Sequence, residues 1–244
     1  MQNKYEQAAF KELKSWQKKV QKKASLPSLL ADHLQKKWNG LIPEKVHKGI
    51  TVVIEKMVKS VLFGSKYATA GPKAYPSLED IEIKVNRLIS IYKHTASVEG
   101  AVAGTGGVLF GLAEFPVLIS LKIKMLFDIA AAYGFDVKDY KERLYILYIF
   151  QLTFSSQQGR EKVYPIIADW ENYCNNLPDN EDAFDWRAFQ QQYRDYIDLA
   201  KMAQLIPFIG AAVGFVVNKR LVRKLGDFAI NCFRMRYFAA GITP

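Results

Sequence analysis

Apolar residues recur with helical spacing along most of the chain, beginning near its N-terminus. Between Lys4 and Lys23 they lie three or four positions apart, which places them on one face of a helix, and lysines fill much of the remainder. The apolar positions are Tyr5, Ala9, Leu13, Trp16 and Val20. The pattern predicts a basic amphipathic N-terminal helix over residues 1–24, followed by one helical domain over residues 25–244.

Residues that favour helix ends divide the next part of the chain. A short helix is predicted over residues 27–38. A longer one begins near Pro43, a favoured first-turn residue, and stops at Gly64. Ser77 and Asp80 form a capping pair that predicts the start of another helix.

The later segments are helical as well. Pro116 is expected to start a helix that ends at Gly134, and Asp136 is expected to open the one after it. Pro207 interrupts the last long apolar segment. No convincing run of alternating residues indicates strands, and no repeat recurs at a fixed period. The sequence therefore predicts an all-α fold, a single multi-helix domain with a Gly-rich, highly apolar central helical core.

The most unusual segment reads VEGAVAGTGGVLFGLAEFPVLISLKIK, residues 98–124. The fourteen residues between Glu99 and Glu114 carry no charge, and five of them are glycine. A phosphate loop is not favoured, because no strand is expected before it and no lysine ends it. Small residues four apart instead predict smooth columns that let another helix approach closely. The columns are Ala96, Gly100 and Gly104; Ala103, Gly107 and Gly111; and Gly210 with Gly214.

Three segments approach the length of a membrane span, about 20 residues. Residues 101–121 contain a glutamate and a proline, residues 202–218 contain a proline, and residues 144–159 contain several polar side chains. We interpret all three as helices of one large core. A hairpin-like insertion of residues 203–217 into a bilayer is the alternative.

Composition and charge narrow the functional class. Half of the 244 residues are hydrophobic, which excludes a disordered chain. The two cysteines, Cys174 and Cys232, form no metal-binding spacing, and so few thiols are typical of a reducing cytoplasm. The net charge of +10 is concentrated at the ends, with +8 in residues 1–60, +5 in residues 219–244 and −3 between them. Basic ends favour a polyanionic partner, either nucleic acid or an anionic membrane.

An anionic membrane surface or lipid is the favoured partner. No zinc finger, RNA-recognition signature or clear helix-turn-helix accompanies the basic ends, so no nucleic-acid partner is predicted. A Lys-rich helix with apolar residues on its other face suits a membrane interface. The alternative is a solvated surface helix whose apolar stripe packs on the domain. The predicted membrane-contact residues are Lys11, Leu13, Lys14, Trp16, Lys18, Lys19, Lys22, Lys23, Phe208, Lys219, Arg220, Arg223 and Lys224.

No group of residues defines a reaction. The three histidines are scattered, no metal-ligand motif or GxSxG sequence occurs, and neither metal nor cofactor is predicted. Ser155 and Ser156 are interpreted as capping or helix-packing hydroxyls. Glu114 and Asp128 are kept as catalytic candidates, although such carboxylates more often form structural ion pairs, for which Lys124 is available. Glu114 is expected to be buried and paired.

Two long segments resemble the EcsC family. They are EGAVAGTGGVLFGLAEFPVLISLKIKMLFDIAAAYGFDVKDYKERLYILYIFQLTFSSQQGR, Glu99–Arg160, and DWRAFQQQYRDYIDLAKMAQLIPFIGAAVGFVVNKRLVRKLG, Asp185–Gly226. The stretch IPEKVH is similar to a third family segment, so the resemblance covers most of the chain from about Pro43 on. Two positions depart from the family pattern: Glu114 stands where aspartate is usual, and Phe208 stands where glycine is usual.

The resemblance implies a bacterial cytoplasmic protein, peripheral to the inner face of the cell membrane, with no established biochemical activity. The family is named for a protein encoded beside an ABC transporter, so a membrane transporter is an implied partner. We expect a peripheral, lipid-binding accessory protein. The alternative is a hydrolase-like enzyme that acts on a lipid or another amphiphile through buried carboxylates. The oligomeric state is not predicted.

Overall fold

The computed structural model describes residues 4–22, 44–63, 71–105, 107–197 and 210–240. Within these ranges the protein consists of α-helices, one short 3₁₀ helix (η1, Glu181–Ala183) and an isolated β-bridge between Ser155 and Ile197. The all-α prediction is confirmed. The helix predicted over residues 27–38 lies outside the described residues.

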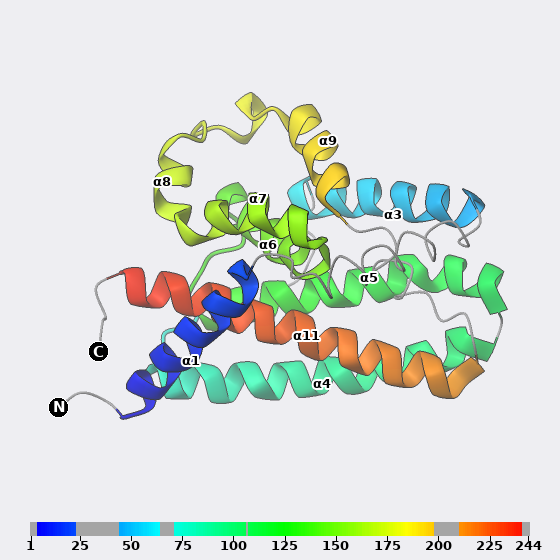
Figure 1. The fold of residues 1–244 in the computed structure, drawn as a ribbon, viewed down its shortest axis with the longest axis horizontal. Coiled ribbons are helices and arrows are strands. Elements are labelled where there is room, and N and C mark those ends of the chain that lie inside the picture. The colour runs from blue at the N-terminus through cyan, green and yellow to red at the C-terminus, as the bar shows by residue number, and fades with distance from the viewer. Residues whose placement is uncertain (1–3, 23–43, 64–70, 106, 198–209, 241–244) are drawn as a thin grey trace.

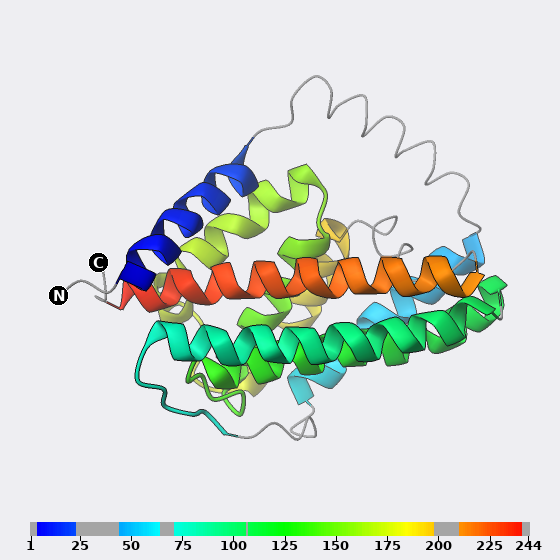
Figure 2. The same cartoon turned by 90° about the horizontal axis from the view of Figure 1, so that it is seen from below.

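Three long helices pack against one another as a bundle (Figures 1 and 2). α4 (Leu78–Thr105) and α11 (Gly210–Ala239) run antiparallel and make the most extensive helix pair. α5 (Gly107–Ala132) follows α4 and packs against it, antiparallel. Figure 2 shows α4 and α11 side by side along most of their length.

Shorter helices cover the opposite side of α5 and α11 (Figure 1). α6 (Tyr140–Phe154) packs against α3, α5, α7 and α11, where α3 is Glu44–Phe63 and α7 is Gln157–Ala168. α8 (Trp170–Asn175) follows α7, and α9 (Trp186–Tyr196) packs against α3 and α7.

The N-terminal helix α1 (Lys4–Gln21) closes the structure from the side. It contacts α11, α7 and α4. The ring of Phe10 lies edge-on to Phe238 near the end of α11, with 5.1 Å between centroids. The first and last described helices therefore meet at one end of the molecule.

The centre of the core is α6. Every side chain from residue 143 to residue 154 is buried, because protein surrounds this helix on all sides. Tyr145 packs against Trp170 and Phe233, with ring centroids 4.8 and 5.5 Å apart. The uncharged residues 144–154 are thus core, as interpreted from sequence. No helix among the described residues has the length and apolarity to cross a membrane.

Several helix ends lie where local signals predicted them. α3 ends at Phe63, just before Gly64. The Ser77 hydroxyl accepts a hydrogen bond from the Asp80 N–H (3.2 Å) and donates one to the Asp80 carboxylate (2.6 Å), which confirms the capping pair. α5 ends before Gly134, whose φ of +88° favours glycine.

Two predicted helix starts are wrong. Pro116 lies inside α5, and its own side chain is exposed. Packing of α5 against α3 and α4 outweighs the backbone hydrogen bond that proline removes. Asp136 lies in a turn before α6, where its carbonyl accepts from the Asp139 N–H (3.0 Å). Asp139 is the actual cap, because its carboxylate accepts from the Lys141 N–H.

The predicted glycine columns also need revision. α4 ends at Thr105 and α5 begins at Gly107, so the column that starts at Ala103 is divided between two antiparallel helices. The structure places a close helix approach elsewhere, at Gly226 of α11. A Cβ there would lie 2.6 Å from the Ile89 Cδ1 of α4. The packing roles of Gly100, Gly104, Gly107, Gly111, Gly210 and Gly214 stay predictions.

Candidate functional site

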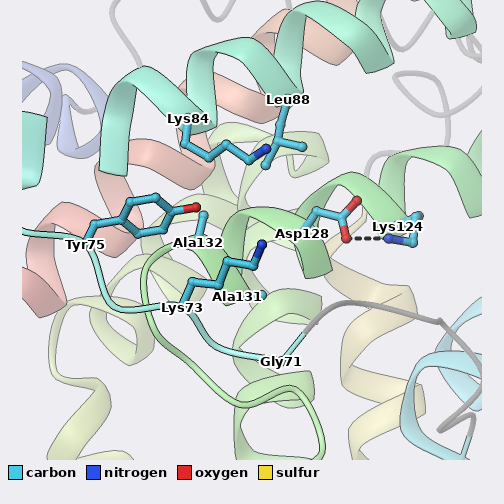
Figure 3. Close-up of a pocket in the computed structure, with 9 residues that line it drawn as sticks. All are labelled: Gly71, Lys73, Tyr75, Lys84, Leu88, Lys124, Asp128, Ala131 and Ala132. Carbon is cyan, nitrogen blue, oxygen red and sulfur yellow. Dashed lines mark hydrogen bonds and ion pairs between the residues drawn. The ribbon is translucent and has the colours of Figure 1, made fainter. Parts of the chain in front are cut away.

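A cavity of about 290 Å³ opens between α4, α5 and the segment before α4 (Figure 3). Its lining brings together three lysines, one carboxylate and several apolar side chains. These residues are Gly71, Lys73, Tyr75, Lys84, Leu88, Lys124, Asp128, Ala131 and Ala132. A concave site with converging polar groups is a candidate binding site, and we call it the lysine pocket.

The segment 71–76 closes one side of the lysine pocket because it is anchored at two points. The Lys73 N–H donates to the Ala131 carbonyl (3.2 Å) in the last turn of α5. Tyr75 packs against the core, and the fully buried Leu78 then begins α4. These anchors hold the side chains of Lys73 and Tyr75 over the pocket, as Figure 3 shows.

The charges in the lysine pocket do not balance. Asp128 forms an ion pair with Lys124, one turn earlier on α5. Lys73 and Lys84 come from the anchored segment and from α4, and both reach into the space between them (Figure 3). Among the described residues, neither has a carboxylate within ion-pair distance. The pocket therefore carries an excess of positive charge.

Both oxygens of Asp128 are occupied. One accepts from Lys124 and the other accepts from the Tyr92 hydroxyl of α4. Burial, together with this hydrogen bond and the negative charge of Asp128, raises the pKa of Tyr92 above its usual range. Tyr92 therefore stays protonated at neutral pH and remains a donor. Asp128 fixes Lys124 in place, which confirms the ion pair foreseen from sequence and gives no support to a catalytic role.

No described residues assemble a nucleophile or metal site. Burial raises the pKa of the Cys174 thiol to about 11 and that of the fully buried Cys232 thiol well above its usual range, so both stay protonated at neutral pH. Ser155 donates to a carbonyl one turn earlier (2.6 Å), and Ser156 caps α7, as predicted. No three metal-ligand side chains cluster within the described part of the chain.

Exposed positions on α4 and α11 form a second candidate surface. Three strongly exposed apolar side chains lie there: Ile83 (63% exposed), Ile91 (53%) and Val216 (61%). They alternate with arginines that are also exposed, namely Arg87, Arg220 and Arg223. We call these six residues the outer face.

Two contacts fix the register of the helix pair. Gly226 meets Ile89, and Arg234 meets Glu82, so α11 runs past α4 in a fixed antiparallel alignment. Arg223 lies one turn from Gly226, on the side of α11 that carries the exposed row. Two exposed acidic residues accompany these rows, Asp227 on α11 and Asp80 on α4, against three arginines. The outer face is therefore basic and apolar at once.

The apolar stripe of α1 is used by the protein itself. Leu13 is 2% exposed. Trp16 packs edge-on against Phe228 of α11 and tilts against Tyr164 of α7, with centroids 5.3 and 6.5 Å apart. The domain therefore covers Leu13 and covers Trp16 in part, and a membrane contact of these two side chains stays a prediction. The alternative applies, a surface helix packed on the domain, whose exposed lysines are Lys11, Lys14, Lys18, Lys19 and Lys22.

This packing predicts a role in stability for Trp16. Trp16→Ala should lower the free energy of unfolding by about 1–3 kcal/mol, because two aromatic contacts of about 0.5–1.5 kcal/mol each are lost. Denaturant unfolding measures the change, and Lys18→Ala at an exposed position of α1 is the control. If Trp16→Ala leaves the stability unchanged but weakens binding to vesicles, the result supports a contact of Trp16 with the membrane instead.

The other predicted contacts divide into two groups. Lys219, Arg220 and Arg223 are exposed on α11. Lys224 is half-buried and its Nζ lies 5.8 and 5.9 Å from the ring centroids of Phe154 and Phe228. It therefore faces the core side of α11. Three predicted side chains lie outside the described ones: Lys23, Glu114 and Phe208.

A buried ion-pair network joins α1, α4 and α11, and the sequence did not predict it. Arg234 donates to both oxygens of Glu82, at 2.7 and 2.6 Å, and to Glu12 at 2.9 Å. The hydroxyls of Tyr5 and Tyr133 also donate to Glu82, at 2.7 and 3.2 Å. The signal that could have found it is Glu82 itself, because this carboxylate lies among the apolar residues on the inward-facing side of α4.

A second arginine of α11 is also internal. Arg236 donates to both oxygens of Glu142, at 2.6 and 2.9 Å, and its guanidinium lies 3.8 Å from the ring centroid of Phe135. Arg234 and Arg236 are two of the six cations in residues 219–244. The positive charge at the C-terminal end is therefore smaller on the surface than in the sequence.

These features define an all-α protein with a lysine-rich pocket and a basic, partly apolar helical face. The model of the EcsC protein family matches residues 7–238, and the chain belongs to this family. It is 38% identical over 232 residues to "Protein EcsC" of Bacillus subtilis (strain 168), covering 94% of this chain and 95% of that protein. It is 26% identical over 258 residues to "Uncharacterized protein YdbA" of the same organism, covering 93% and 90%. No solved structure matches the chain.

Proposed function

We propose that this EcsC-family protein is a peripheral membrane protein that binds anionic lipid surfaces reversibly, at the cytoplasmic face of the cell membrane. The observation that supports the proposal is the outer face, where isoleucine and valine alternate with arginine on two long helices. Apolar side chains of this kind enter the boundary between headgroups and acyl chains, and arginines meet the anionic headgroups.

The expected strength of binding follows from the number of groups. Each basic side chain near an anionic surface contributes about 1 kcal/mol, so three arginines give a weak attraction that salt reduces. Burial of three apolar side chains adds a part that salt does not reduce. Together they produce reversible attachment, in contrast to insertion of a spanning helix.

The exposed lysines of α1 supply further positive charge. They contribute to attraction at long range while Leu13 and Trp16 stay packed on the domain. Attachment therefore requires no release of α1. An accessory role beside an ABC transporter, which the family resemblance implies, requires the same location and is part of this proposal.

Vesicle sedimentation tests the outer face. The wild-type protein should bind vesicles of phosphatidylcholine and phosphatidylglycerol, bind pure phosphatidylcholine much less, and be partly released by salt. Reversing the three arginines, Arg87→Glu, Arg220→Glu and Arg223→Glu, should lower the affinity for anionic vesicles by at least about tenfold, since more than 1.4 kcal/mol is lost.

A matched variant controls for net charge. Lys56→Glu, Lys59→Glu and Arg187→Glu change the net charge equally, but these exposed residues belong to α3 and α9, on the other side of the molecule (Figure 1). This variant should keep most of the affinity. Equal losses in both variants, or equal binding of the wild type to neutral and anionic vesicles, would contradict the proposal. Tight binding to duplex DNA without vesicle binding would favour a nucleic-acid partner instead.

A further inference from the structure

The lysine pocket holds more positive charge than its one carboxylate neutralises. Asp128 is paired with Lys124, whereas Lys73 and Lys84 have no carboxylate partner among the described residues. Grouping like charges is unfavourable unless an anion compensates for it. From this imbalance we infer that the pocket binds a phosphate monoester, either free in solution or as the headgroup of a lipid.

A phosphate monoester matches the pocket in charge and in hydrogen bonding. Such a group carries a charge of about −1.5 to −2 at pH 7 and presents several acceptor oxygens. Lys73, Lys84 and Lys124 supply ammonium donors, and lysine is a regular ligand of phosphate. The hydroxyl of Tyr75 lies at the same wall (Figure 3). A divalent cation would meet three lysines and a single carboxylate, so the pocket does not suit it.

The pocket is organised before any ligand arrives. Asp128 holds Lys124, and Tyr92 holds the second oxygen of Asp128. The hydrogen bond from the Lys73 N–H to the Ala131 carbonyl fixes the backbone from which Lys73 extends. The Lys124 ammonium and the backbone of Lys73 therefore lose little conformational freedom when the pocket binds an anion, which favours affinity.

The size and the apolar wall restrict the ligand further. A volume of about 290 Å³ lies at the lower end of small-molecule pockets, so the ligand is small. Leu88, Ala131 and Ala132 line one side without polar side chains. A phosphate attached to a short carbon chain, such as glycerol phosphate, fits this combination of charge and apolar surface.

The pocket lies next to the outer face along α4. Lys84 follows Ile83 and Leu88 follows Arg87, and consecutive residues are rotated by about 100° around a helix. Attachment through the outer face would thus bring the pocket near the level of the lipid headgroups. The lipid form of this inference, binding of phosphatidic acid, rests on the proposed membrane function. The soluble form does not.

The soluble form is tested by calorimetric titration with sn-glycerol 3-phosphate at low salt, with glycerol as the uncharged control. The wild type should bind one equivalent. The variant Lys73→Gln/Lys84→Gln should bind at least about tenfold more weakly, because two of the three cations are lost. The variant Lys73→Arg/Lys84→Arg keeps the charge and should keep binding, and Lys56→Gln/Lys59→Gln on α3 should match the wild type.

The lipid form is tested with two vesicle types of equal surface charge, phosphatidylcholine mixed with phosphatidic acid or with phosphatidylglycerol. A preference of the wild type for phosphatidic acid that disappears in Lys73→Gln/Lys84→Gln supports the lipid headgroup as ligand. Binding of glycerol phosphate without this preference supports a soluble phosphate ester.

The outcomes separate this inference from the proposed function. If the wild type binds anionic vesicles but shows neither glycerol phosphate binding nor a preference for phosphatidic acid, the inference is overturned and the membrane proposal stands. If it binds glycerol phosphate through Lys73 and Lys84 but binds no vesicle, the inference stands and the membrane proposal fails. The inference is also overturned if Lys73→Gln/Lys84→Gln and the wild type bind glycerol phosphate with equal affinity.

Discussion

Replacing Glu82 with alanine should lower the free energy of unfolding by about 3–5 kcal/mol. The change leaves Arg234, whose side chain is 8% exposed, without its bidentate partner, and the guanidinium stays charged at any pH in which the protein is folded. Tyr5 and Tyr133 lose the same acceptor. For a chain of this size the melting temperature should fall by roughly 10 °C, which calorimetry or denaturant unfolding measures.

Two further variants show whether the loss comes from the unpaired charge. Glu79→Ala removes an exposed carboxylate from the same helix and should change stability by less than about 0.5 kcal/mol. Glu82→Leu combined with Arg234→Met removes both charges and should be more stable than Glu82→Ala, because no buried charge is left alone. A loss below about 1 kcal/mol in Glu82→Ala would show that water reaches and solvates Arg234.

The difference between predicted and unpredicted features follows from their distance along the chain. The caps at Ser77 and the end of α5 at Gly134 depend on residues a few positions apart, so the sequence contains the whole signal. The Glu82–Arg234 pair joins residues 152 positions apart. A helical pattern shows that Glu82 lies in an apolar row, but only the packing of α4 on α11 shows which cation meets it.

The lysine pocket escaped prediction for the same reason. Lys73, Lys84 and Lys124 are ordinary surface lysines in the sequence, and no motif relates them. The turn of the chain from the anchored segment into α4, and the antiparallel return of α5, bring them to one cavity. The distribution of charge along the sequence indicates that both ends of the chain are basic. Two arginines of α11, Arg234 and Arg236, nevertheless form ion pairs inside the protein.

The outer face was predicted in part. Arg220 and Arg223 were named from the basic C-terminal segment and are exposed, whereas their partner row on α4, with Ile83 and Arg87, was assigned no role. Local sequence identifies a basic row on one helix. Which second helix lies beside this row depends on helix packing. Here Gly226 has no side chain, and α11 therefore packs closely against Ile89 of α4.

The contact between Gly226 and Ile89 leaves no space for a side chain on α11. Gly226→Leu should destabilise the protein by about 3 kcal/mol, because a Cβ at this position already lies 2.6, 2.8 and 3.1 Å from Ile89 Cδ1, Cγ1 and Cγ2. The larger side chain forces α4 and α11 apart along the pair that carries the outer face. Denaturant unfolding gives the loss, and vesicle binding should fall with it if the face depends on the register of the two helices.

Making room on α4 should restore part of the loss. Gly226→Ala/Ile89→Ala should be at least about 1 kcal/mol more stable than the sum of the two single changes indicates, since residues in direct contact couple by about 0.5–3 kcal/mol. Gly71→Ala, where a Cβ meets nothing within 4 Å, is the control and should have little effect. Wild-type stability of Gly226→Leu, or strict additivity of the pair, would mean that the helices have space between them and that the tight α4–α11 contact does not exist in solution.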